Sequence, residues 1–215
     1  VDLPEDIPLM WDGGVTALRH GSQGILAALT AHRDQDMNPV ELENKLQYLI
    51  GYKLILRRLY PDKPLAAAYL LSIREFVKEI GAPSKKGELA AEHLNAREHT
   101  DPKEHIDQGL ALFKGKAGCI RCHHGPSLTD GRFYNLNLDS ADPGRAAITL
   151  LEEDKGRFRT APLVLLSKTA PYFHNGSAAN LENVLQHYTE GAGEAGRIAL
   201  NAEEKDALLA YLRSL

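Results

Sequence analysis

The stretch Lys116–Gly131, KAGCIRCHHGPSLTDG, contains both cysteines of the 215-residue chain and places a histidine directly after the second. Cys119, Cys122 and His123 form the pattern C-x-x-C-H, which is the attachment signature of a c-type haem. Two thiols at this spacing can each add to a vinyl group of one porphyrin, and the adjoining imidazole can then bind the iron. The pattern therefore predicts one haem bound covalently to this chain.

Other uses of the two cysteines explain the pattern less well. A disulfide between Cys119 and Cys122 would close a very short loop. A zinc site would need two further ligands, for which His124 is the nearby candidate. A thioredoxin-like redox pair would need a preceding strand, which Ala111–Gly118 does not indicate. Because none of these alternatives also explains the histidine, we favour haem.

The composition indicates a globular protein without the excess of basic residues that is typical of nucleic-acid binding. The chain has 25 basic and 29 acidic side chains, a formal net charge of -4, and no apolar run as long as a membrane span. It starts at Val1 without a basic and then apolar segment, which is typical of a processed product. Since c-type haem is attached outside the cytoplasm, we predict a periplasmic protein with no membrane span.

Hydrophobic periodicity predicts a mainly α-helical fold. Apolar residues recur at three- and four-residue steps through Val40–Tyr60 and again through Pro64–Ile80. Gly81 and Pro83 then form a helix stop signal. The polar stretch Ser84–Thr100 that follows has the composition of a linker.

Further helices are expected on both sides of the haem motif. Asp101 and the proline after it mark the start of a helix that leads to the haem cysteines. Asn201 can cap the last helix, with Glu204 three residues later as in a capping box. Between residues 125 and 168, glycines, prolines and aspartates show little periodicity, so we expect long loops around the cofactor.

Several blocks of the sequence carry a family resemblance. They are ALFKGKAGCIRCHHGPSLTDGRFYN from Ala111, DPGR from Asp142, GRFRTAPL from Gly156 and TAPYFHNGSAANLENVLQHY from Thr169. In this order they resemble the second haem domain of the bacterial di-haem cytochrome c peroxidases and the related MauG enzymes. Upstream, LMWDGG from Leu9 and NPVE from Asn38 resemble segments that follow the first haem site of that family.

The resemblance implies mainly α c-type cytochrome domains with long loops around the haem. Residues 1–100 would be the remainder of a first, peroxidatic haem domain whose own attachment segment is missing from this chain. Residues 101–215 would be a second c-type haem domain. A second haem is therefore expected in the complete protein.

The identity of the sixth ligand of the haem iron distinguishes electron carriers from enzymes of this type. A high-potential carrier usually has an axial methionine, but the methionines of this chain, Met10 and Met37, lie far upstream of the haem motif. In the family, the sixth ligand lies near the end of the helix after PYFHNG. It is a methionine in the peroxidases and a tyrosine in MauG-type enzymes. Tyr188 stands at that position here.

The resemblance therefore implies that His123 and Tyr188 are the two axial ligands. Asn180 marks the start of the helix that carries the tyrosine. The alternatives are that Tyr188 is a surface residue of this helix and that His174 or His187 binds the iron instead.

Four further residues receive roles from the resemblance alone. Trp11 matches a tryptophan that lies between the two haems and relays electrons. Glu41 matches a carboxylate that moves a proton over the open face of the first haem. Thr169 and Pro171 match residues whose carbonyl oxygens bind a calcium ion between the haems. The alternatives are a core aromatic for Trp11 and a solvated helix-start glutamate for Glu41.

These features together predict an oxidoreductase of the di-haem peroxidase and MauG type. It would use hydrogen peroxide to oxidise a protein partner, through high-valent haem and a Trp11 relay. A cytochrome c peroxidase that removes peroxide with electrons from a donor protein is the alternative within this class. A single-haem electron-transfer cytochrome is the alternative outside it.

Overall fold

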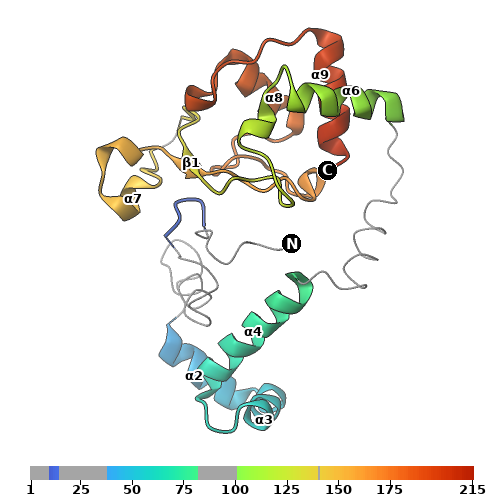
Figure 1. Cartoon of the computed structure of the whole chain (residues 1–215). Helices are drawn as coiled ribbons and strands as arrows, with labels where there is room; N and C mark the ends of the chain where they lie inside the picture. Colours follow the sequence, from blue (N-terminus) through green and yellow to red (C-terminus); the bar gives the residue numbers. More distant parts are fainter. Residues whose placement is uncertain (1–9, 15–37, 82–100, 140) are drawn as a thin grey trace. The chain divides into compact units, whose positions relative to one another are not determined.

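The computed structural model of the chain describes residues 10–14, 38–81, 101–139 and 141–215 (Figure 1). These residues form a mainly helical fold, as predicted. The helices are α2 (Pro39–Tyr48), α3 (Ile50–Leu59), α4 (Leu65–Gly81), α6 (Lys103–Lys114), α7 (Ala146–Thr149), α8 (Leu181–Glu190) and α9 (Ala202–Arg213). Within the described ranges, no helix is both long enough and apolar enough to cross a membrane.

The described residues fall into two compact units. One contains α2, α3 and α4; the other contains Met10–Gly14 and the chain from α6 onward. The segment Met10–Gly14 thus joins the second unit, although the sequence assigned it to the first domain, because it accepts hydrogen bonds from the Arg159 backbone and the Arg145 side chain. The expected linker, Ser84–Thr100, lies outside the described residues.

The first unit has a small core and one helix break that the sequence did not predict. Helical periodicity was predicted over Val40–Tyr60, and the structure divides this stretch into two helices: α2 ends at Tyr48 and α3 begins at Ile50. Leu49 between them has the non-helical angles φ -85° and ψ 80°. The break lets both helices pack on α4, and the buried core comprises Leu42, Leu46, Leu56, Leu65 and Ala68.

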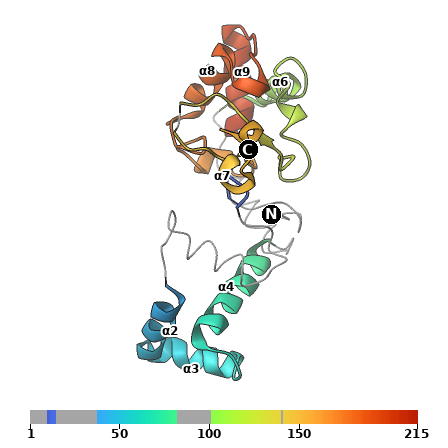
Figure 2. The ribbon, with the colours of Figure 1, turned by 90° about the vertical axis from the view of Figure 1, so that its left-hand side faces the viewer.

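The second unit is organised around the close packing of α6 against α9. Figures 1 and 2 show the two helices side by side. Phe113 of α6 and Leu208 of α9 are the largest fully buried side chains among the described residues. At the crossing, a Cβ on Gly109 would lie 2.0 Å from the carbonyl oxygen of Ala207, so only glycine fits.

The helix ends in this unit follow the predicted signals. Asn201 accepts a hydrogen bond from the backbone of Glu204, whose side chain accepts one from the backbone of Asn201, so the capping box is confirmed. Pro102 directly precedes the first residue of α6, as expected. Asn180 caps α8 by accepting a hydrogen bond from the backbone of Asn183.

Residues 125–168 are mostly loop, as predicted, but they contain a small antiparallel sheet. Its strands are β1 (Phe133–Tyr134) and β2 (Phe158–Arg159). Phe133 pairs with Arg159, and Tyr134 pairs with Phe158. The backbone nitrogen of Arg159 also donates to the carbonyl of Trp11 at 2.8 Å, so the segment Met10–Gly14 lies beside β2.

The α6–α9 crossing predicts opposite effects for two glycine-to-alanine substitutions. Gly109→Ala should lower the free energy of unfolding by about 1–3 kcal/mol, because the new methyl overlaps α9. Gly51→Ala in α3 should raise it by up to about 1 kcal/mol, because nothing lies within 4 Å of the new Cβ and alanine favours helix. Urea unfolding followed by far-ultraviolet circular dichroism measures both; equal effects at the two sites would contradict the packing.

Candidate functional site

A cavity of about 780 Å³ lies inside the second unit. Its apolar lining comes from all three main helices and includes Phe113 of α6, Leu185 of α8 and Leu208 of α9. Its polar lining includes both cysteines, His123, Arg159, His174 and Tyr188. A volume of this size, mostly apolar with a few convergent polar groups, is typical of a cofactor site.

The haem motif forms one helical turn at the wall of this cavity. Gly118 adopts the left-handed conformation, φ 67°, and so turns the chain away from α6. The backbone nitrogen of His123 then donates to the carbonyl of Cys119 at 2.9 Å. As a result, both half-buried thiols and the imidazole line the same cavity.

The environment of these cysteines disfavours the alternative chemistries. Burial raises the pKa of the Cys119 thiol to about 11, whereas redox-active and nucleophilic cysteines have a lowered pKa. Cys119 and Cys122 do not pair in a disulfide. Within the described ranges, no group of three or more histidine, cysteine or acidic side chains could hold a metal ion such as zinc.

His123 is oriented by a backbone contact. Its Nδ1 lies 3.0 Å from the carbonyl oxygen of Leu128, to which it can donate, and this leaves Nε2 for a metal. Burial lowers the pKa of the imidazole, which favours the neutral form that binds metal ions.

Hydrogen bonds fix the loop that supplies the Leu128 carbonyl. The hydroxyl of Thr129 donates to the Thr160 carbonyl at 2.7 Å. The hydroxyl of Tyr134 donates to the Asp130 carboxylate at 2.8 Å, and burial together with this acceptor raises the pKa of Tyr134 to about 12. These bonds tie the loop to β1 and to the residue after β2, so the orientation of His123 is built into the fold.

Tyr188 reaches the cavity because α8 presents one face to it. Residues at helical spacing line the wall: Leu181, Val184, Leu185 and Tyr188. The tyrosine ring lies beside Phe173, with the ring centroids 6.5 Å apart. Burial raises the pKa of Tyr188, so the phenolate would form here only beside a bound cation.

The two histidines that were alternatives to Tyr188 differ in their surroundings. His187 Nε2 lies 2.8 Å from the carbonyl oxygen of Leu136, and this side chain does not line the cavity. His174 does line it, stacked on Phe158 with ring centroids 3.4 Å apart. Tyr188 and His174 are therefore the candidates that the geometry retains.

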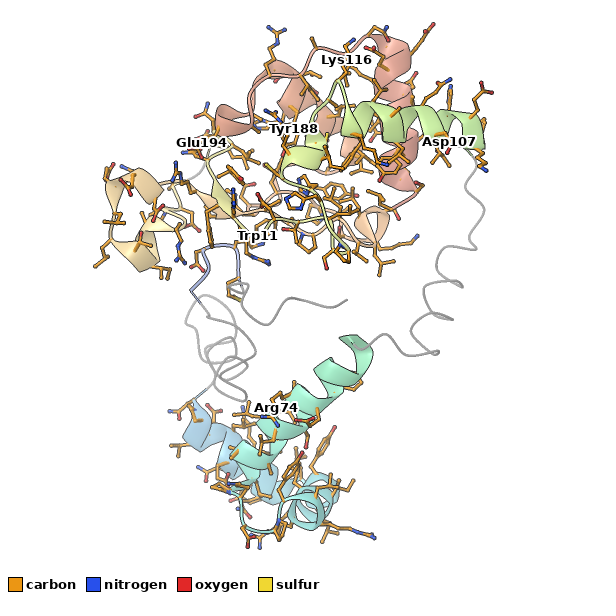
Figure 3. All side chains as sticks on the ribbon, viewed as in Figure 1. Trp11, Arg74, Asp107, Lys116, Tyr188 and Glu194 are labelled. Carbon is orange, nitrogen blue, oxygen red and sulfur yellow. The ribbon has the colours of Figure 1, made fainter. Side chains whose placement is uncertain are left out.

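The remaining predicted residues come from three separate segments of the chain. Trp11 lines the cavity with 42% of its surface exposed (Figure 3). Glu41 belongs to the first unit, in the first turn of α2, with its carboxylate 2.8 Å from the Lys45 ammonium. Thr169 and Pro171 are exposed residues just after the 3-10 turn Leu166–Lys168. Their roles stay predictions.

Two buried polar atoms lie on the cavity wall: one belongs to Arg159, which the sequence analysis did not single out, and the other to His174, the alternative ligand. Nη1 of Arg159 and Nε2 of His174 have no hydrogen-bond partner within the described part of the chain. Burying the guanidinium charge of Arg159 is costly unless an anion meets it. Haem combines a large apolar ring with two carboxylates, so the cavity fits this cofactor. The only sequence signal for Arg159 was its place in the GRFRTAPL block.

The rim of the cavity is closed by a carboxylate with two partners. Glu194 accepts a hydrogen bond from the backbone nitrogen of Asn135 at 2.7 Å and another from the Arg157 guanidinium at 2.6 Å. The Asn135 N–H and then Arg157 hold the pKa of Glu194 below its ordinary value of 4.5.

Comparison with known proteins identifies relatives along almost the whole chain, although no protein-family model matches it. Cytochrome-c peroxidase IdrP2 of Pseudomonas sp. (strain SCT) is 27% identical over 239 residues, which cover 96% of this chain and 64% of the relative. The methylamine utilization protein MauG of Methylophilus methylotrophus is 30% identical over 227 residues, covering 96% and 63%. The chain thus spans less than two thirds of the length of these relatives.

A solved structure supports the fold. The crystal structure of a MauG-like protein associated with microbial copper homeostasis matches with a TM-score of 0.62, over 90% of this chain and 68% of that one. The sequences are 21% identical, so this match describes the fold.

The Glu194 contacts predict a specific pH dependence. The stability from ionised Glu194 is fully present above its ordinary pKa of 4.5 and is lost as the pH falls through its lower folded pKa. Glu194→Gln should therefore destabilise the protein near neutral pH by less than about 1 kcal/mol, since the pair is partly exposed, and the difference should vanish once the pH lies below the folded pKa of Glu194.

Arg157→Gln provides the matched comparison. It should show a smaller effect of the same sign, because the Asn135 N–H remains. Urea unfolding at a series of pH values measures both variants. A Glu194→Gln curve parallel to the wild-type curve at every pH would contradict the prediction.

Proposed function

Because this chain is a relative of the bacterial cytochrome c peroxidases and MauG along 96% of its length, we propose that it is part of a periplasmic c-type haem oxidoreductase. This enzyme uses hydrogen peroxide to oxidise a protein partner. In the proposal, residues 101–215 are its second haem domain, and residues 1–100 are the remainder of its first, peroxidatic domain.

The observation that carries the proposal is the pairing of the haem motif with a tyrosine in one cavity. Cys119 and Cys122 would hold the haem through thioethers, and His123 and Tyr188 would be its axial ligands. When bound, the haem supplies one-electron redox chemistry at its iron. The chain's own residues orient this group: Leu128 fixes the imidazole, and the apolar face of α8 aims the tyrosine.

The choice of tyrosine favours an oxidising enzyme over an electron carrier. An anionic oxygen ligand stabilises the more highly charged iron and so lowers the reduction potential, whereas carriers use methionine to raise it. Met10 does not line the cavity, and Met37 lies outside the described residues. This argument speaks against the single-haem electron carrier as the alternative.

Trp11 is suited to pass electrons between the haem and its surroundings. The indole lines the cavity and is also partly open to the outside. In the proposal it relays oxidising equivalents between the two haem sites, and a side chain of the protein partner is the final electron source. The alternative source is a small electron-donor protein, as in a cytochrome c peroxidase that removes peroxide.

The first unit supports a role as part of a larger domain. Apolar side chains of α2, α3 and Leu49 are exposed, namely Tyr48, Leu49, Ile50, Tyr52, Leu54, Ile55 and Leu59. An apolar patch of this kind marks a contact surface, and the remainder of a haem domain would cover it. In the proposal, Glu41 serves this domain as the proton-moving carboxylate, and the carbonyls of Thr169 and Pro171 bind calcium.

A haem count and a peroxide assay on the secreted protein test the function. Mass spectrometry and the haem absorbance should give two covalent haems per complete polypeptide, and hydrogen peroxide should be consumed with oxidation of a protein partner. Consumption supported equally well by any small reduced cytochrome would favour peroxide removal instead. One haem and no reaction with peroxide would refute the enzyme.

The axial-ligand assignment predicts a selective effect of Tyr188→Phe. The haem should stay attached, because the thioethers and His123 do not depend on this hydroxyl. The ferric absorption and electron paramagnetic resonance spectra should change, and the reduction potential should rise by on the order of 100 mV, within the about 0.8 V range that axial ligands control.

Two further variants make the test specific. Tyr172 also lines the cavity, but its hydroxyl donates to the Leu166 carbonyl at 3.1 Å, so Tyr172→Phe should leave the spectra unchanged. His174→Gln should also preserve the axial ligation. If His174→Gln changes the ferric spectrum and Tyr188→Phe does not, the histidine is the ligand and the assignment fails.

A further inference from the structure

We propose that Arg159 is a positioning residue that couples Trp11 to the haem, by holding the tryptophan segment with one side of its guanidinium and a haem carboxylate with the other. The proposal rests on haem binding as proposed above. It adds a residue that determines where the electron-relaying tryptophan lies.

The segment Met10–Gly14 is held by two arginines of the second unit. Arg159 donates from its backbone nitrogen to the Trp11 carbonyl at 2.8 Å and from Nε to the Met10 carbonyl at 3.3 Å. Arg145 donates from Nη1 to the carbonyls of Asp12 and Gly13, at 3.1 Å each. The tryptophan is therefore bracketed by contacts to its neighbours' backbone.

The segment is packed most closely at Gly13. This residue is buried with φ 70°, and a Cβ there would lie 2.5 Å from both the Arg145 guanidinium and the ring of Phe133. The guanidinium of Arg145 in turn stacks over Phe133, 4.6 Å from the ring centroid. Phe133 pairs with Arg159 across the small sheet, so both arginines contact the same strand residue.

Only one of the two arginines also faces the cofactor site. Arg159 lines the cavity together with Trp11, whereas Arg145 does not. The Nη1 of Arg159 is buried and, among the described residues, has no hydrogen-bond partner. A guanidinium is always charged and presents its donors in a planar fork, so Nε and Nη1 can serve two acceptors at once. A haem carboxylate is the anion that the proposed cofactor brings to this cavity.

The consequence is that haem binding and tryptophan placement are not independent. A carboxylate on Nη1 fixes the plane of the guanidinium, and this plane sets the Nε contact to the Met10 carbonyl next to Trp11. Trp11 is then held most firmly when the cofactor is in place.

The single tryptophan of the chain makes the test direct. In the holoprotein, Trp11 fluorescence is quenched by the nearby haem, so release of the segment appears as a rise in emission. Arg159→Gln should raise the emission and also shift the haem reduction potential downward, because a positive charge beside a haem carboxylate is lost. Arg145→Gln is the matched control: it should raise the emission and leave the potential unchanged.

Arg159→Lys keeps the proposal testable if Arg159→Gln does not fold. Lysine retains the charge but has one nitrogen, so it cannot serve the Met10 carbonyl and the carboxylate together, and one of the two readouts must change. If Arg159→Gln alters the emission but not the reduction potential, Arg159 only holds the tryptophan segment, as Arg145 does. That result would overturn the proposed coupling between Trp11 and the haem. Unchanged emission in Arg159→Gln, or wild-type values of both readouts in Arg159→Lys, would overturn it as well.

The haem content of each protein separates this proposal from the proposed function. A wild-type protein without covalent haem would refute the function itself. A wild-type protein with haem, in which the variants behave contrary to expectation, would refute only the role of Arg159.

Discussion

The close crossing of α6 and α9 at Gly109 is the constraint on which the haem unit depends. Because the backbone of α9 occupies the space of a side chain there, α6 is fixed in position up to Lys114, and the haem motif follows within a few residues. The same two helices supply Phe113, Leu208 and Leu212 to the cavity wall. The attachment turn and the space that receives the cofactor are thus set by one packing contact.

The polar groups of the cavity are arranged for a ligand that brings both a cation and anions. Burial favours neutral His123 and neutral Tyr188, so neither side chain supplies a charge until a metal is present. Arg159 supplies a positive charge elsewhere on the wall, and its Nη1 has no hydrogen-bond partner among the described residues. An iron with two peripheral carboxylates satisfies all three, whereas a purely apolar ligand would leave the guanidinium unpaired at a cost.

The two units differ in how completely they bury their apolar side chains. The second unit buries a continuous core from α6, α8 and α9, including Leu163 and Ile198 from its loops. Among the described residues, the first has a core of five small or aliphatic side chains and a broad exposed apolar surface on α3. This contrast agrees with relatives that are longer than this chain.

The sequence by itself determined the features that depend on neighbouring residues. The spacing of Cys119, Cys122 and His123, the caps at Asn180 and Asn201, and the helical periods are local, and each can be interpreted without a partner elsewhere in the chain. The tertiary structure alone decided the long-range contacts. The break at Leu49 follows from packing on α4, His187 turns to the carbonyl of Leu136, and Arg159 meets the backbone beside Trp11 from almost 150 residues away along the chain. Such contacts depend on which distant groups share one buried space, and no local pattern of residue types records that.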